Sequence, residues 1–239
     1  MKRNVLIGTM ALLAGSLFAA DSSPKDDVTS AAKKLAEKNN YSWKTTVETG
    51  GGGGRFGGPT EGKTEKDGCT FLSMTRGENT IEAVLKGGKG AVKTPDGWKT
   101  LAEAAEGGGD QPNPGRFLAR MLQNFKAPAA QAEDLIAKAK EVKKDGDAYA
   151  SDLTEAGVKE LLSFGPPRGG GDAPAVSNAK GSVKFWLKDG LVSKMQIKVQ
   201  GTVSFGGNDR DVDRTTTVEV KDIGTTKIEV PDEAKKKLS

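Results

Sequence analysis

One stretch of the 239-residue sequence matches a motif that holds nucleotide phosphates. Residues 57–64, Gly-Gly-Pro-Thr-Glu-Gly-Lys-Thr, fit the phosphate-loop pattern. The chemistry requires a buried strand before the loop and a helix after it, so that backbone amides and the helix N-terminus grip the phosphates. Here glycines 50–54 come before the loop, and residues 65–68, which form a turn, lead into a strand. We therefore expect no nucleotide site.

A second stretch begins like a calcium loop. Residues 209–213 read Asp-Arg-Asp-Val-Asp, but Arg214 stands where glycine is required and Val220 where the bidentate glutamate belongs. We expect a charged hairpin loop here and no metal site. The chain has no histidine, which excludes Ser-His-Asp and Cys-His catalysis and the usual zinc sites. The sequence therefore predicts no enzyme and no cofactor. A hydrolase that uses two carboxylates is the alternative, since geometry alone identifies such a pair.

The chain has one cysteine, Cys69, so it forms no intrachain disulfide. Cys69 alternates in step with Phe71 in a predicted strand, which favours a buried, unreactive side chain. A reactive thiol or an intermolecular bridge is the alternative.

Charge and the first residues limit the possible partners and the compartment. The 36 basic and 32 acidic residues are interspersed along the chain, which argues against nucleic-acid binding. Lys2 and Arg3 precede an apolar run at 5–18 and small residues at 19–20, as in a secretory signal peptide. An uncleaved anchor is the alternative, but the run is shorter than the ~20 residues that a spanning helix needs. No cysteine follows the run that could carry a lipid.

We therefore predict a signal peptide at 1–20, a single domain at 21–239, and a secreted or periplasmic protein without a stable transmembrane span. Glycine-rich loops are expected at 50–58, 107–112 and 165–180. The basic residues 235–237 are read as a solvated terminus, balanced by nearby acidic residues. No oligomeric state is predicted.

The clearest structural signal is a meander of antiparallel strands at 181–230. Apolar and polar residues alternate with a period of two, and Asp189-Gly190 forms a strong two-residue hairpin signal. Ile228 and Val230 are expected to close the run. Such alternation over this length predicts a sheet with one apolar face and one wetter face.

The preceding segments predict a helix, then strands, then helices. The first helix is expected at 28–38, with strands at 41–49, 69–76, 80–86 and 91–93. Helices follow Asn113-Pro114, Pro128 and Thr154, with a short strand at 147–152, and 165–167 ends the last helix. Residues 168–179 are read as a linker. This segregated order is typical of an α+β fold.

Two apolar faces are candidates for the lining of an apolar cavity. One is the stripe along the helix after Pro114, and the other is the apolar side of the meander. The candidates are Phe117, Met121, Leu122, Phe125, Phe185, Leu187, Met195, Ile197, Val199, Val203 and Phe205.

This layout resembles the periplasmic lipoprotein-carrier (LolA-like) superfamily, which includes related lipid-carrier lipoproteins. The resemblance lies in the signal peptide, the short helix, the first strand Tyr-Ser-Trp-Lys-Thr-Thr-Val at 41–47, the helical middle and the strand-turn-strand at 183–194. It implies a curved antiparallel sheet, an incomplete β-barrel, with helices covering its open or concave side. It also implies apolar acyl chains bound between sheet and helices. The long glycine loops and the three-helix middle depart from the family.

Two functions follow as hypotheses. The first is a non-enzymatic protein that binds a lipid, the acyl chain of an acylated protein or another apolar ligand between sheet and helices. The second is a structural or protein-interaction module of the cell envelope with a closed core. The lack of an apolar cavity of at least ~300 Å³ would favour the second function over the first.

Overall fold

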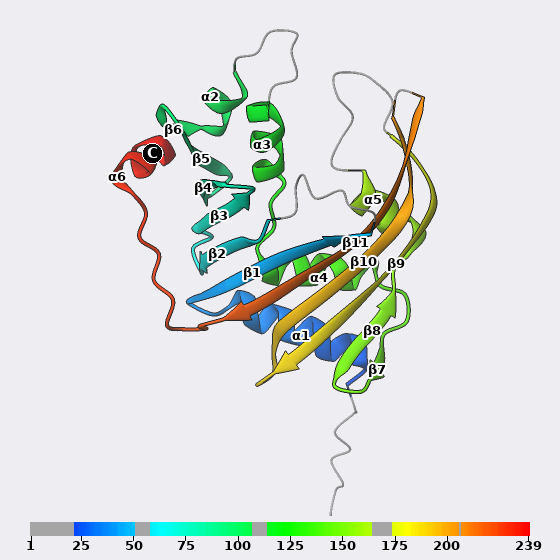
Figure 1. The fold of residues 1–239 in the computed structure, drawn as a ribbon. Helices are drawn as coiled ribbons and strands as arrows, with labels where there is room; N and C mark the ends of the chain where they lie inside the picture. The colour runs from blue at the N-terminus through cyan, green and yellow to red at the C-terminus, as the bar shows by residue number, and fades with distance from the viewer. Residues whose placement is uncertain (1–21, 51–57, 107–113, 164–173, 206) are drawn as a thin grey trace, which may run out of the picture.

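A single curved antiparallel sheet with most of its helices on its concave side forms the fold (Figure 1). The structure, a computed structural model, describes residues 22–50, 58–106, 114–163, 174–205 and 207–239. The eleven strands lie in the order β6-β5-β4-β3-β2-β1-β11-β10-β9-β8-β7, so the sheet is open. The predicted fold class, α+β with a curved open sheet, is confirmed. The predicted signal peptide lies outside the described residues.

The three longest strands, β9, β10 and β11, follow one another in the second half of the chain. The strands of the first half are β1 Asn40–Thr49, β2 Thr60–Glu65, β3 Thr70–Arg76, β4 Asn79–Lys86, β5 Lys89–Thr94 and β6 Gly97–Thr100. Those of the second half are β7 Lys143–Asp145, β8 Ala148–Asp152, β9 Ala175–Lys188, β10 Leu191–Phe205 and β11 Asn208–Lys221. We call β2–β6 the wing of the sheet. The described helices are α1 Pro24–Ala36, α2 Leu101–Ala105, α3 Pro114–Gln123, α4 Pro128–Lys138, α5 Glu155–Leu162 and α6 Asp232–Leu238.

Helices α1, α4 and α5 cover the concave face of β9–β11. Helix α1 begins at a capping box between Ser23 and Asp26, and its apolar stripe is fully buried. Thr154 caps α5 by accepting a hydrogen bond from the amide of Gly157. Helix α5 lies close to the strands because glycines 181 and 201 have no side chain; a Cβ at Gly201 would lie 2.8 Å from Leu162 Cδ1. No helix in the described residues is long and apolar enough to cross a membrane.

The predicted meander is largely confirmed, and it is corrected at both ends. Asp189 and Gly190 form the expected hairpin turn with positive φ of 52° and 71°. The expected linker at 168–179 is wrong in its last residues, because Ala175 already pairs with Ser204 of β10. Ile228 and Val230 do not close the sheet. A turn at 222–226 ends β11, and those two side chains pack on the outer face of the wing.

The outer face of the wing carries a second, smaller core. Cys69, Val84, Ala91 and Trp98 pack with Ala234 of α6, and Leu238 lies against them. Both faces of β4 are therefore covered, which explains why Ala83 and Val84 are each 0% exposed. Lys235 and Lys236 are exposed, as the prediction of a solvated terminus expects, but residues 235–237 belong to α6 and Lys237 pairs with Glu103. Cys69 is buried, as expected, and burial raises the pKa of its thiol.

Other differences between the predicted and the observed elements occur where a strand consists mainly of polar residues. Residues 60–65 form β2 although they hold only threonine, glutamate, glycine and lysine. Residues 97–100 and 101–105, for which the sequence predicts no element, form β6 and α2. Residues 209–213 are part of β11 rather than a loop, and Asp211 and Asp213 accept hydrogen bonds from Thr202 and Gln200 at 2.8 Å each. The described residues hold no cluster of metal-binding side chains.

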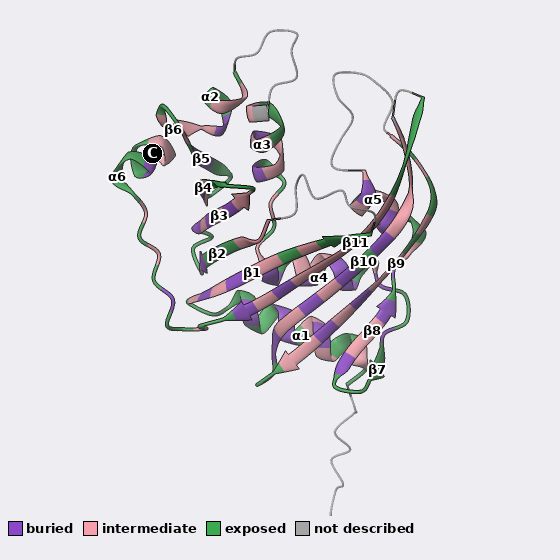
Figure 2. Ribbon diagram, viewed as in Figure 1, coloured by how far each residue is buried: buried purple, intermediate pink, exposed green. Residues whose placement is uncertain are grey.

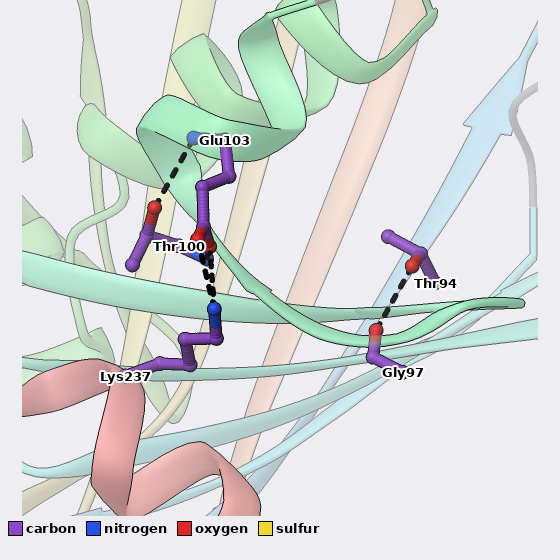
Figure 3. Close-up of polar contacts among 5 residues, drawn as sticks. All are labelled: Thr94, Gly97, Thr100, Glu103 and Lys237. Atoms are coloured by element: carbon purple, nitrogen blue, oxygen red, sulfur yellow. Dashed lines mark hydrogen bonds and ion pairs between the residues drawn. The ribbon is translucent and has the colours of Figure 1, made fainter.

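Helix α6 is tied to α2 by an ion pair. Lys237 Nζ donates to Glu103 Oε1 at 2.8 Å, and Glu103 also accepts from the backbone amide of Thr100 at 2.7 Å (Figure 3). The hydrogen bond from Lys237, followed by the one from the Thr100 amide, lowers the pKa of Glu103 to about 2. The two helices thus meet at one carboxylate at the edge of the wing.

This carboxylate gives a pH-dependent prediction. The folded pKa of Glu103 is depressed, so its contribution to stability is present above its unfolded pKa of ~4.3 and is lost as pH falls towards 2. We expect Glu103→Gln to lower the Tm at pH 6 and to match the wild type near pH 2. Thermal unfolding followed by circular dichroism at both pH values measures this, with Glu106→Gln as control. Equal differences at both pH values would contradict the prediction.

Candidate functional site

A pocket of about 210 Å³ lies between the C-terminal end of α3 and the wing. Its apolar lining comes from four segments: Leu85 at the end of β4, Leu101 at the start of α2, Leu122 of α3, and Phe125 just beyond α3. The pocket opens to solvent beside the β4–β5 turn, where Lys86 and Lys89 form part of its lining. The arrangement is a short apolar recess with basic side chains at its entrance.

The polar groups at the inner end of the pocket are paired. The indole of Trp43 donates from Nε1 to Thr64 Oγ1 at 3.2 Å, and the hydroxyls of Thr64 and Thr70 lie 3.3 Å apart. The ring of Trp43 stacks on Phe125 with centroids 5.6 Å apart. Since these hydroxyls already have partners, the pocket offers apolar contact there rather than a strong polar anchor.

Two glycines allow the aromatic and aliphatic side chains around the pocket to pack directly against the strand backbones. A Cβ at Gly62 would lie 2.1 Å from Cζ2 of Trp43, so the indole rests directly on the β2 backbone. A Cβ at Gly90 would lie 2.6 Å from Leu101 Cδ1 and 2.7 Å from Leu85 Cδ2. Gly62 is therefore a packing position and does not belong to a phosphate loop. Strand β2 includes residues 60–64 of the motif, whereas a phosphate loop requires an irregular loop there and a helix after it.

The two entrance lysines have different surroundings. Lys86 forms an ion pair with Asp67 at 2.7 Å, which raises the pKa of Lys86 and lowers that of Asp67. Lys89 is exposed, and none of the ion pairs in the described residues includes it. The ammonium of Lys89 is thus available to an anionic group at the entrance.

The helices fill the concave face of β9–β11. Phe185 and Met195 are 0% exposed and Val199 is 1% exposed, and all three belong to the main core together with α1, α4 and α5. Ile197 is also buried there. These predicted lining residues contact the helices directly, and none of them borders the pocket.

The remaining predicted lining residues are dispersed. Leu122 and Phe125 border the pocket, while Phe117 points outward with 43% of its surface exposed. Met121 is half-buried, and its sulfur accepts from Arg76 at 3.6 Å. Leu187 and Val203 are half-buried at the edge of the main core. The side chain of Phe205 lies outside the described residues.

The structure also has an outer hollow of about 480 Å³ beneath the segment that joins β11 to α6. Its lining is Lys63, Phe71, Thr225, Lys227 and Glu229, and Lys63 Nζ donates to the Lys227 carbonyl at 3.1 Å. This hollow is charged and open, so it is not the apolar cavity that the sequence predicts.

Sequence reasoning missed Leu85, Leu101, Thr64 and Thr70. One signal was available for Leu85, which alternates in step with Ile81 and Ala83 on β4. Leu101 stands with Trp98 at the start of a short apolar stretch, whereas no signal marks Thr64 and Thr70, which lie in or beside polar stretches. The amphipathic pattern of α3 gives the helix a buried face but does not specify which part of the sheet it covers.

Comparison with known proteins gives similarity in three-dimensional structure only. No family model matches the sequence, and no curated protein matches it. Among solved structures, LprF from Mycobacterium bovis matches with a TM-score of 0.47 and 10% identity, over 88% of this chain and 97% of that one. The lipoprotein LppX from Mycobacterium tuberculosis matches with a TM-score of 0.45 and 8% identity, over 87% and 98%.

A LolA superfamily protein from Nitrosomonas europaea matches with a TM-score of 0.31 and 9% identity, over 88% of this chain and 96% of that one.

Proposed function

We propose that this protein is a non-enzymatic binding protein of the cell envelope, and that it takes the apolar tail of an anionic amphiphile between α3 and the wing. The observation that carries the proposal is the recess formed by Leu85, Leu101, Leu122 and Phe125. The basic entrance at Lys86 and Lys89 supports a ligand with an acidic head, such as a fatty acid.

The size of the recess defines how such a ligand would enter. About 210 Å³ is below the ~300 Å³ at which ligand pockets begin, so the closed form holds only part of a long chain. Helix α3 is the element suited to move. Its main contact is with α2, and its residues Leu118 and Met121 are only half-buried. A tail that displaces α3 would extend the recess along the inner face of the wing.

A fluorescent fatty acid tests the proposal. We expect the wild type to bind the probe and Leu85→Trp, which fills the recess, to weaken binding at least about tenfold, because the tail loses the apolar surface that it buries. Ile81→Trp is the matched control, since Ile81 is a half-buried residue on the same side of β4 and does not line the recess. Lys89→Glu should weaken binding of the acid more than binding of the corresponding alcohol.

The second candidate function is an interaction module with a closed core. The complete burial of Phe185, Met195 and Val199 favours it, because the concave face of β9–β11 has no room for a ligand. Native mass spectrometry and lipid extraction separate the two functions. A bare protein that takes up no probe would reject ligand binding and leave the interaction module.

A further inference from the structure

The outer face of β9 and β10 carries a line of lysines. In both strands the alternate residues Val183, Phe185, Met195, Ile197 and Val199 are buried against the helices. The residues between them therefore lie on the opposite, outer face of the sheet, and burial alternates along both strands (Figure 2). We call Lys180, Lys184, Lys188, Lys194 and Lys198 the lysine ladder.

The pairing of the strands spaces these charges evenly. Lys180 pairs with Gln200, Lys198 with Ser182, Lys184 with Gln196, and Lys194 with Trp186. Each successive cross-strand pair thus contains one lysine and one uncharged residue, alternately on β9 and on β10. Lysines directly opposite one another would repel, and this register avoids such pairs while keeping one charge in every row.

Acidic residues are scarce on β9 and β10 themselves, although the neighbouring strand β11 places Asp211, Asp213 and Glu219 on the same face. Residues 175–205 contain five lysines, one acidic residue (Asp189) and no arginine, whereas the whole chain has 36 basic and 32 acidic residues. Lys184 forms an ion pair with Asp145 at 2.7 Å. None of the ion pairs in the described residues involves the other four ladder lysines, and Glu219 beside Lys194 bonds to Lys221 at 3.3 Å instead. Asp211 and Asp213 accept hydrogen bonds from Thr202 and Gln200, so the ammonium groups of Lys180, Lys188 and Lys198 form no ion pair within the described residues.

An aromatic residue lies within the ladder. Trp186 is only partly buried although it is large and apolar, and the ammonium of Lys194 lies 5.0 Å from the centre of its ring. Tryptophan with one apolar and one wet side is typical of positions where a protein meets the headgroup region of a bilayer. The tryptophan is a second feature, separate from the charge, that points to the same kind of partner.

We propose that the outer face of β9–β10 docks onto an anionic membrane surface. Each lysine held near an anionic leaflet strengthens attachment about fivefold, and long flexible side chains adapt to headgroups that move in the plane. The ladder offers ammonium groups without the arginine forks that pair with phosphates in nucleic acids. The concave face and the pocket lie on the other side of the sheet, so docking leaves the helices free.

Vesicle sedimentation tests this inference. We expect the wild type to bind vesicles of equimolar phosphatidylglycerol and phosphatidylcholine at low salt and to dissociate from them in molar salt. It should not bind vesicles of pure phosphatidylcholine. The variant with Lys180, Lys188, Lys194 and Lys198 replaced by glutamine should bind at least about tenfold more weakly. A control variant removes the same charge from the helical side at exposed residues Lys25, Lys33, Lys38 and Lys140. This control should bind within about twofold of the wild type.

The outcomes are decisive in both directions. Failure of the wild type to bind anionic vesicles, an equal loss in both variants, or equally tight attachment to polyglutamate or single-stranded DNA would each overturn the proposal. Circular dichroism confirms that the variants are folded, and the salt dependence of the wild type provides a test that needs no variant. Since Leu85→Trp should leave vesicle binding unchanged, failure of the pocket proposal and failure of this one are distinguishable.

Discussion

Replacing Phe185 by alanine is expected to lower the free energy of unfolding by about 4 kcal/mol. Phe185 is 0% exposed and lies between Tyr149 and Met195 in the register of the sheet, under the helical layer. Removal of the ring takes away its transfer free energy and leaves a cavity that a tightly packed core fills only in part. Urea unfolding followed by circular dichroism measures the change.

The matched control is Phe117→Ala, which removes the same ring from α3. Phe117 is 43% exposed, so we expect this change to lower stability by less than about 1 kcal/mol. The comparison also distinguishes a closed core on the concave face from an open ligand cavity. If Phe185 lined an open ligand cavity, its ring would make fewer contacts and its loss would cost about as little as that of Phe117. Similar values for the two variants would contradict the closed core of β9–β11.

The sequence predicts the second half of the sheet because each strand has one buried face. Along β9 and β10 every second residue enters one core, so alternation reveals both the strands and the side chains that face the helices. The turn at Asp189-Gly190 adds a local signal that fixes the register, since both residues need positive φ. In this part of the chain, the alternating pattern and the turn residues therefore predict the strands that the structure contains.

The strands of the wing are harder to predict than β9 and β10, because side chains on both faces of the wing are buried. Val84 and Ala83 are both buried, as α6 covers one face and the inner helices are on the other, so β4 does not alternate cleanly. Strand β2 was missed because its glycine is needed for Trp43 and its other residues are polar. The candidate site joins four segments distant in sequence, and no local pattern encodes which of them meet.

Replacing Gly62 by alanine is expected to lower the free energy of unfolding by about 3 kcal/mol. Alanine is intrinsically no worse than glycine in a strand, so any loss must come from packing. Its Cβ would lie 2.1 Å from Trp43 Cζ2, and the indole has no free direction of movement, because Phe125 stacks on it and Thr64 accepts its hydrogen bond. Urea unfolding measures the loss.

A double-mutant cycle tests the cause of that loss. Trp43→Leu leaves space above β2, so Gly62→Ala in that background should cost less than about 1 kcal/mol, which gives a coupling energy of about 2 kcal/mol. Glu61→Ala, at the exposed neighbouring position, is the control and should have little effect. Additive losses would contradict contact between Gly62 and Trp43. Since Phe125 links Trp43 to the recess, Gly62→Ala should also weaken binding of the fatty-acid probe, which connects the packing of β2 to the proposed function.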